Sequence, residues 1–161
     1  MKKNCVLTLL AVVILLAACG NGANENQQDN SPNSDPQSKT KEPEDYDPKR
    51  GEGKFSAENV VLGAIDAGMA SKGEAIAGTK CTSCHKLTEE RLVGPGWKGV
   101  TQRRTPHWIM NFITNPDPMI DKDPQVQAEL ELCLVRMPNQ NLGDEDARSI
   151  VEFMRKIDGA K

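Results

Sequence analysis

The string Cys81-Thr82-Ser83-Cys84-His85 constrains this chain more than any other feature. Two cysteines separated by two residues are followed at once by a histidine. C-x-x-C-H is the attachment signature of a c-type haem, since each thiol can add to one haem vinyl group and the adjacent imidazole can ligate the iron. We therefore predict one covalent haem c, held by Cys81 and Cys84, with His85 as the proximal iron ligand.

Two other uses of the cysteine pair stay open at this point. A lone C-x-x-C can form a redox disulfide or supply half of a zinc site. The chain has no second C-x-x-C and only one other histidine, His107, so a zinc site would need Cys133 or a carboxylate. A thioredoxin-like site would follow a strand, whereas the residues before Cys81 have helical spacing. The sequence favours the haem.

Residues 1–18 have the plan of an export signal. Lys2 and Lys3 precede an apolar run, residues 5–18, which is too short for an ordinary membrane span. Residues 16–19, Leu-Ala-Ala-Cys, resemble the lipobox of bacterial lipoproteins. This resemblance implies cleavage before Cys19 and lipidation of its thiol. The alternatives are ordinary cleavage that leaves a free thiol, and retention of the uncleaved segment as an anchor.

A lipid anchor would place the protein on a membrane outside the cytoplasm. Acyl chains stabilise membrane binding by about 0.8 kcal/mol per buried CH₂. Export also agrees with the haem motif, because the maturation of c-type haem proteins is an extracytoplasmic process in bacteria. We expect the periplasmic side of a membrane or the cell surface.

Residues 20–54 contain no Ile, Leu, Val, Met, Phe or Trp, and Tyr46 is their only aromatic residue. Such a segment buries too little apolar surface to offset the entropy of ordering it. We predict a lipidated cysteine and disordered linker over residues 19–54, dispensable for redox chemistry, and one folded domain over residues 55–161. With the stiffness of a Gly-rich chain, the linker spans roughly 30 Å r.m.s..

The charge balance argues against nucleic acid as a partner. The chain has 20 Lys and Arg residues against 23 Asp and Glu residues, a formal net charge of −3. No basic patch is evident. Aromatic residues make up only 4% of the chain, so a buried haem would supply much of the apolar volume that the core lacks.

Apolar residues recur with helical spacing over the whole predicted domain, and no alternating strand pattern is evident. We predict a small all-α domain wrapped around the haem. One apolar stripe runs from Val60 to Met69. A capping box from Ser71 to Glu74 is predicted to open the helix that leads to Cys81.

Three further helices are indicated by their first residues. Thr105-Pro106 has the pattern of an N-cap and first helical position, and the Asn-Pro-Asp-Pro run at 115–118 should end that helix in a loop. Asp123-Pro124 predicts the start of another helix. The last helix should begin near Gly143, which three acidic residues follow where the helix dipole favours them.

Over about residues 70–158 the chain resembles the class I (monohaem) cytochrome c family. The haem motif lies near the start of this region, and Pro95 matches the loop proline of the family. The resemblance implies that the Pro95 carbonyl accepts a hydrogen bond from Nδ1–H of His85, which orients the imidazole. It also implies that Trp97 packs against the haem.

The same resemblance extends to the distal side of the haem. Residues 137–140, Met-Pro-Asn-Gln, resemble the distal methionine loop of the family, which implies that Met137 is the sixth iron ligand. Methionine is by default a filler of gaps in protein cores. Met119, expected in the Pro-rich loop, and His107 are the rival ligands.

Two further positions match the family and two depart from it. Gly73 stands where the family carries a small residue in its first helix, and Phe153 matches an aromatic residue of the last helix, which crosses the first helix near that glycine. Ala77 occupies a position that is often aromatic. Cys133 has no counterpart, and we expect a buried small hydrophobic side chain.

Three side chains are candidates for the propionate side of the haem. Arg103 and Arg104 either pair with a propionate or form a solvated charged pair. Trp108 is expected in the core, with an indole N–H that is also able to reach a propionate.

Ligation of the iron by His85 and Met137 would leave no open position for a substrate, and His/Met ligation raises the reduction potential. We predict a membrane-tethered one-electron carrier of a respiratory chain, not an enzyme. It would link a donor, such as a quinol-oxidising complex, to a terminal oxidase or reductase. A haem enzyme or small-ligand sensor with a labile distal site is the alternative, and a structural lipoprotein with a redox-inert C-x-x-C is a third possibility.

Overall fold

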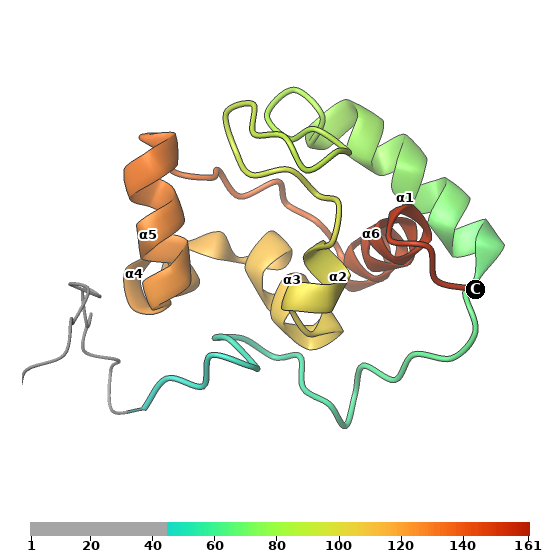
Figure 1. The fold of residues 1–161 in the computed structure, drawn as a ribbon. Coiled ribbons are helices and arrows are strands. Elements are labelled where there is room, and N and C mark those ends of the chain that lie inside the picture. Colours follow the sequence, from blue (N-terminus) through green and yellow to red (C-terminus); the bar gives the residue numbers. More distant parts are fainter. Residues whose placement is uncertain (1–44) are drawn as a thin grey trace, which may run out of the picture. The chain divides into compact units, whose positions relative to one another are not determined.

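Six helices and no strands make up the secondary structure of residues 45–161, the part of the chain that the computed structural model describes (Figure 1). The predicted all-α class is confirmed. The export signal, Cys19 and most of the predicted linker lie outside the described residues. The helices are α1 (Ala67–Lys80), α2 (Val100–Arg103), α3 (Pro106–Thr114), α4 (Pro116–Lys122), α5 (Pro124–Cys133) and α6 (Asp144–Ile157).

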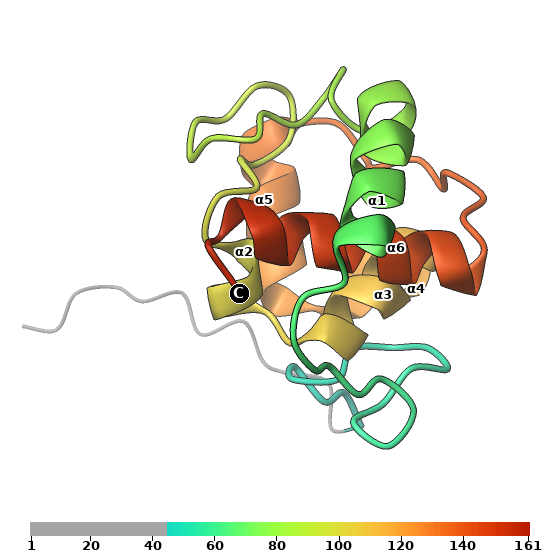
Figure 2. The same ribbon diagram turned by 90° about the vertical axis from the view of Figure 1, so that its right-hand side faces the viewer.

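Helices α1 and α6 cross in direct contact, as Figure 2 shows. Gly73 permits this close approach, because a Cβ atom at residue 73 would lie 2.1 Å from the carbonyl oxygen of Ser149. Phe153 on α6 is buried, and so is Ala77, whose small side chain lies in the same core. The crossing near Gly73 that the resemblance implied is therefore observed.

Helix α1 begins earlier than predicted. The carboxylate of Asp66 accepts a hydrogen bond from the backbone N–H of Met69 at 2.9 Å, so Asp66 is the N-cap. Ser71 and Glu74 consequently lie inside the helix, and the predicted capping box is wrong. The stripe that begins at Val60 is mostly irregular chain rather than helix, although Val60 itself is buried in the core.

The predicted starts of three later helices are confirmed. Thr105 and Asp123 cap α3 and α5 with their side chains, and Gly143 is the N-cap of α6. The run at 115–118 ends α3 but does not form the predicted loop. Its prolines lie in the first turn of α4, where a missing backbone N–H leaves no helical hydrogen bond unmade.

The linker predicted to reach residue 54 ends earlier. Residues 45–55, which we call the N-terminal strap, run beside α3, and both views show them on the same side of it (Figures 1 and 2). The Asn111 side chain on α3 donates to the carbonyl oxygens of Arg50 and Phe55 at 3.0 Å each and accepts from the Phe55 N–H at 2.9 Å. Tyr46 is 7% exposed. The strap is thus part of the folded domain.

Candidate functional site

A cavity of about 550 Å³ lies among the haem motif, α3, α5 and the segment that leads into α6. Cys81, Cys84 and His85 line it together with Met137, which comes from far along the chain. Cofactor pockets have volumes of about 300–1,000 Å³. The structure therefore brings the four residues predicted to hold the haem to one cavity of suitable size.

The motif forms a tight turn at the end of α1. Cys81 is the C-cap of the helix, and its carbonyl oxygen accepts hydrogen bonds from the backbone N–H groups of Cys84 and His85 at 3.0 Å each. This turn gives both cysteines and the histidine access to the same cavity. Neither Cys81 nor Cys84 is part of a disulfide.

The imidazole of His85 is held by the loop that follows the motif. Its Nδ1 lies 2.8 Å from the carbonyl oxygen of Pro95, as the resemblance implied. A carbonyl only accepts hydrogen bonds, so Nδ1 carries the proton and Nε2 has the free lone pair that a metal needs. Gly94 passes so close that a Cβ atom there would lie 2.3 Å from Cε1 of His85. The Trp97 ring also lies near the imidazole, with 5.9 Å between the two ring centroids.

The other uses of the cysteine pair fit this structure less well. Burial raises the pKa of the Cys81 thiol, whereas a redox-active C-x-x-C needs a thiol of lowered pKa. Within residues 45–161, no group of three or more His, Cys, Asp or Glu side chains could hold a metal ion. These findings argue against a thioredoxin-like centre and against a zinc site in this region.

Met137 and its two rivals lie in different surroundings. Met137 is partly buried and lines the cavity. Met119 lies in α4 rather than in a loop and is fully buried. It packs against Gly51 so closely that a Cβ atom added to Gly51 would lie 2.4 Å from Cε of Met119. Neither Met119 nor His107 is among the residues that line the cavity. The placement favours Met137.

The predicted pocket residues Pro95, Trp97, Arg103 and Trp108 all line the cavity. Arg103 is exposed, and its guanidinium donates to the Lys98 carbonyl at 3.1 Å. The indole N–H of Trp108 donates a hydrogen bond to the carboxylate of Asp123, at 3.0 Å.

Asp123 and Arg104 are the polar residues whose importance the sequence understates. Asp123 is fully buried, although its pattern predicted only a helix cap. Arg104 lines the cavity with a side chain that is 14% exposed, and its guanidinium lies over the Trp108 ring, 4.0 Å from the ring centroid. The lone aromatic residue of the linker, Tyr46, was the one available sign of this cluster.

Cys133 differs from the buried hydrophobic side chain that we predicted. It is half-buried, lines the cavity, and its sulfur accepts a hydrogen bond from the Arg91 guanidinium. Arg91 also pairs with Glu129 on α5 at 2.5 Å. These contacts connect the loop after the haem motif to the end of α5, which the sequence did not indicate.

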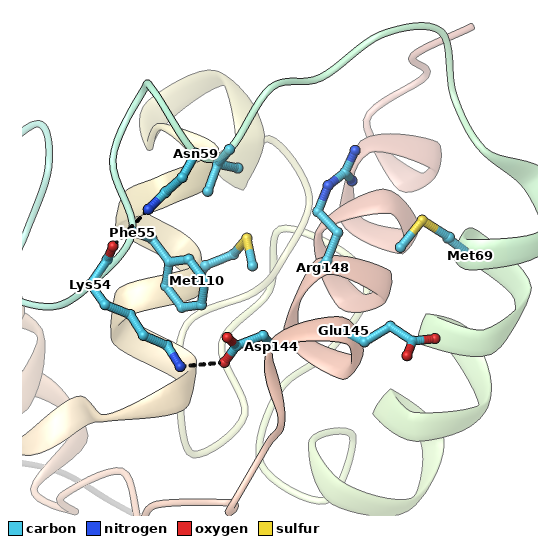
Figure 3. A pocket seen from close by; sticks show the side chains of 9 residues that line it. Lys54, Phe55, Asn59, Met69, Met110, Asp144, Glu145 and Arg148 are labelled. Atoms are coloured by element: carbon cyan, nitrogen blue, oxygen red, sulfur yellow. Dashed lines mark hydrogen bonds and ion pairs between the residues drawn. The ribbon is translucent and has the colours of Figure 1, made fainter.

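A second hollow, of about 520 Å³, lies between the strap and the first turn of α6 (Figure 3). Lys54 and Asp144 form an ion pair across it at 2.6 Å, and Met69 and Met110 are among the apolar lining residues. No cysteine or histidine lines it, so it is not a candidate for covalent haem attachment.

An all-α domain with a C-x-x-C-H turn, a histidine fixed by a backbone carbonyl and a methionine on the same cavity has the architecture of a c-type haem protein. The comparison with known families agrees. The sequence profile described as Cytochrome c matches residues 70–158, and the chain belongs to the cytochrome c family.

Individual relatives support the same family. The chain is 34% identical over 67 residues to a cytochrome c-553-like protein from a Synechocystis strain, a match that covers 39% of this chain and 64% of that protein. The match thus spans less than two thirds of this relative. Among solved structures, cytochrome c from Rhodothermus marinus is 38% identical, with a TM-score of 0.60 over 64% of this chain and 89% of that one. An engineered variant of it, Rma TDE, gives the same identity and TM-score.

Members of the cytochrome c family bind covalent haem c and are electron-transfer proteins rather than enzymes. The single C-x-x-C-H string gives this chain one haem. The free thiols, the oriented imidazole and the size of the cavity all fit that group.

Proposed function

We propose that this protein is a membrane-tethered one-electron carrier. In this proposal Cys81 and Cys84 would bind the haem, and His85 and Met137 would be the two protein ligands of its iron. The observation that carries the proposal is that His85 and Met137 line the same cavity. With both axial positions taken by the protein, the haem supplies a reversible one-electron couple and no site for a substrate.

The protein contributes orientation on the proximal side. The 2.8 Å hydrogen bond from His85 to Pro95 fixes which ring nitrogen faces the metal and increases the electron donation of the imidazole. The buried ring of Trp97 lies between His85 and Phe153, at 5.9 and 6.4 Å between centroids. This packing resists rotation of the imidazole, so it would help to hold His85 in one orientation as an iron ligand.

On the distal side the backbone supplies the restraint. Pro138 follows Met137 and disfavours helical geometry for residue 137, and the segment is indeed irregular there. A thioether is a weak ligand, and a loop that holds it in place reduces the entropy lost on ligation. Pro138 itself also lines the cavity.

The proposed location and partners rest on the N-terminal sequence. The lipobox-like residues 16–19 support lipidation of Cys19 and attachment to the outer side of a bacterial membrane, facing the periplasm or the cell surface. Within residues 45–161 no helix is both long and apolar enough to cross a membrane. A quinol-oxidising complex as donor and a terminal oxidase or reductase as acceptor suit a respiratory carrier at this location.

Replacement of each candidate methionine tests the proposed ligand set. Met137→Ala should lower the reduction potential, open the sixth position and permit carbon monoxide to bind the reduced protein. Met119→Ala is the matched control for ligation, since it removes a thioether that does not line the cavity, and it should neither open the sixth position nor permit carbon monoxide to bind. If Met119→Ala instead opened the sixth position, the assignment of Met137 would be wrong.

A second variant tests the anchor separately from the redox chemistry. Cys19→Ser should release the haem protein from the membrane into the soluble extracytoplasmic fraction, with an unchanged visible spectrum. Cell fractionation followed by a haem stain measures this. A variant that stayed in the membrane fraction would contradict the lipoprotein assignment and leave the electron-carrier assignment standing.

A further inference from the structure

A buried carboxylate connects the N-terminal strap to the wall of the haem cavity. Asp123, fully buried, accepts hydrogen bonds at Oδ2 from the Tyr46 hydroxyl at 2.6 Å and from the Trp108 indole N–H at 3.0 Å. Its Oδ1 accepts from the backbone N–H groups of Gln125 and Val126 at 2.8 and 3.1 Å. The carboxylate therefore joins the strap, α3 and the first turn of α5.

Two partners of this carboxylate also line the cavity. They are Trp108 and Arg104, whose guanidinium lies 3.9 Å from Oδ2 of Asp123 and stacks over the indole. Burial lowers the pKa of Arg104, and the charge of Asp123 opposes this effect. Arginine nevertheless remains protonated in proteins. The cluster thus holds one positive charge at the cavity wall and one negative charge behind it.

The hydroxyl of Tyr46 remains protonated and so remains a hydrogen-bond donor to Asp123. Burial, followed by the hydrogen bond to Asp123, raises the pKa of Tyr46, so the group keeps its proton throughout the physiological range. The strap is also held close to the domain: a Cβ atom at Gly51, whose φ is +72°, would lie 2.4 Å from the Met119 side chain. The reach of Tyr46 to Asp123 is therefore restrained by packing on the C-terminal side of Tyr46.

We propose that Tyr46 is a positioning residue for the haem pocket: it holds Asp123 in place, and through Asp123 it sets the position of the Arg104 charge and hence the reduction potential of the haem. The proposal rests on this cavity being the haem site. The strap lies outside residues 70–158, the region that matches the family. The potential would thus depend on a segment that leads directly to the predicted membrane tether.

Electrostatics gives opposite signs for two conservative substitutions. Tyr46→Phe removes one donor, so the carboxylate charge is less compensated and draws the guanidinium toward itself, away from the cavity. Both effects favour the ferric form, and the potential should fall. Asp123→Asn removes the negative charge but keeps the shape and a good N-cap for α5. The positive charge of Arg104 is then unopposed, and the potential should rise.

The test is an equilibrium redox titration of the full-length haem protein, wild type and variants, together with thermal unfolding of each. Ser56→Ala is the matched control, because it also deletes one hydroxyl near the strap, and that hydroxyl bonds only to Glu58. We expect a lower potential for Tyr46→Phe, a higher one for Asp123→Asn, and an unchanged one for Ser56→Ala.

The opposite shifts in potential expected for Tyr46→Phe and Asp123→Asn distinguish a positioning role from a general loosening of the fold. A loosened pocket admits water, which favours the ferric form, so both variants would shift downward together. That result, or a wild-type potential for Tyr46→Phe, would overturn the proposal. Loss of haem from the wild type on denaturation would instead show that the covalent site itself is wrongly assigned.

Discussion

The loop around His85 and the N-terminal strap differ in how directly their sequence specifies their structure. Around His85, a short motif and a proline ten positions away settle the arrangement, and the hydrogen bond from Nδ1 to Pro95 is the one expected. The strap has a composition that predicts disorder, yet Tyr46 is buried and the chain lies against α3. Both segments reach the same cavity, one directly and one through Asp123.

The difference shows that a few specific polar contacts can order a segment that lacks aliphatic side chains. The side chains of Asn111 and Thr105 in and before α3 hydrogen bond to the backbone of the strap, and Tyr46 and Phe55 are buried. These partners are remote in sequence, so composition alone cannot reveal them. A chemical motif, by contrast, carries its partners within a few residues.

The largest effect is expected at Gly94, on the side of the molecule that the motif specifies. In Gly94→Ala the new Cβ atom would lie 2.3 Å from Cε1 of His85, well under the 3.0 Å below which such contacts are essentially never seen. The imidazole should move off the iron and break its bond to Pro95. Visible spectra should show loss of the native haem ligation. Gly78→Ala in α1, where nothing lies within 4 Å, should leave the spectrum unchanged.

An intermediate effect is expected where the strap meets α3. Asn111→Ala leaves the two buried backbone groups of Phe55 and the part-buried carbonyl of Arg50 without partners, and each buried group costs about 1–3 kcal/mol. Chemical denaturation should show a clear loss of stability. Asn59→Ala is the control, because it removes an exposed amide that donates to the Lys54 carbonyl at 2.9 Å and accepts from the Ser56 N–H at 2.8 Å. With both partners left open to water, it should cost about 1 kcal/mol or less. Equal losses would mean that the strap is not anchored at Asn111.

The smallest effect is expected at the surface of the strap. Lys122 and Glu52 form an exposed ion pair at 2.9 Å, and pairs of this kind contribute about 0–1 kcal/mol. Lys122→Met should therefore change the midpoint of denaturation little, and added salt should reduce even that difference. A loss as large as that of Asn111→Ala would show that charge pairing, rather than buried hydrogen bonds, holds the strap.

The predictions from sequence succeeded where a local signal has one strong structural meaning. Thr105-Pro106 and Asp123-Pro124 marked helix starts, and Gly73 marked the close crossing of α1 and α6. They failed where two local signals competed. Asp66 caps α1 in place of Ser71, and the prolines at 116 and 118 begin a helix instead of forming a loop.

The residues of the cavity divide in the same way, into those marked by a local motif and those that only distant contacts bring together. Cys81, Cys84, His85 and Met137 were predicted from short motifs, and the structure brings them to one cavity. The second layer, in which Tyr46 and Asp123 support Arg104 and Trp108, depends on contacts between elements that lie far apart in the chain. No spacing rule describes such a layer, so it was visible only in the folded structure.

The central claim is that His85 and Met137 together close both sides of the haem iron, which makes the protein a carrier. Visible spectroscopy of the wild-type protein tests it most directly. The ferric form should show the weak band near the red end of the spectrum that marks sulfur–iron ligation, and the ferrous form should not bind carbon monoxide readily. Absence of that band together with prompt formation of a carbon monoxide complex would contradict the claim.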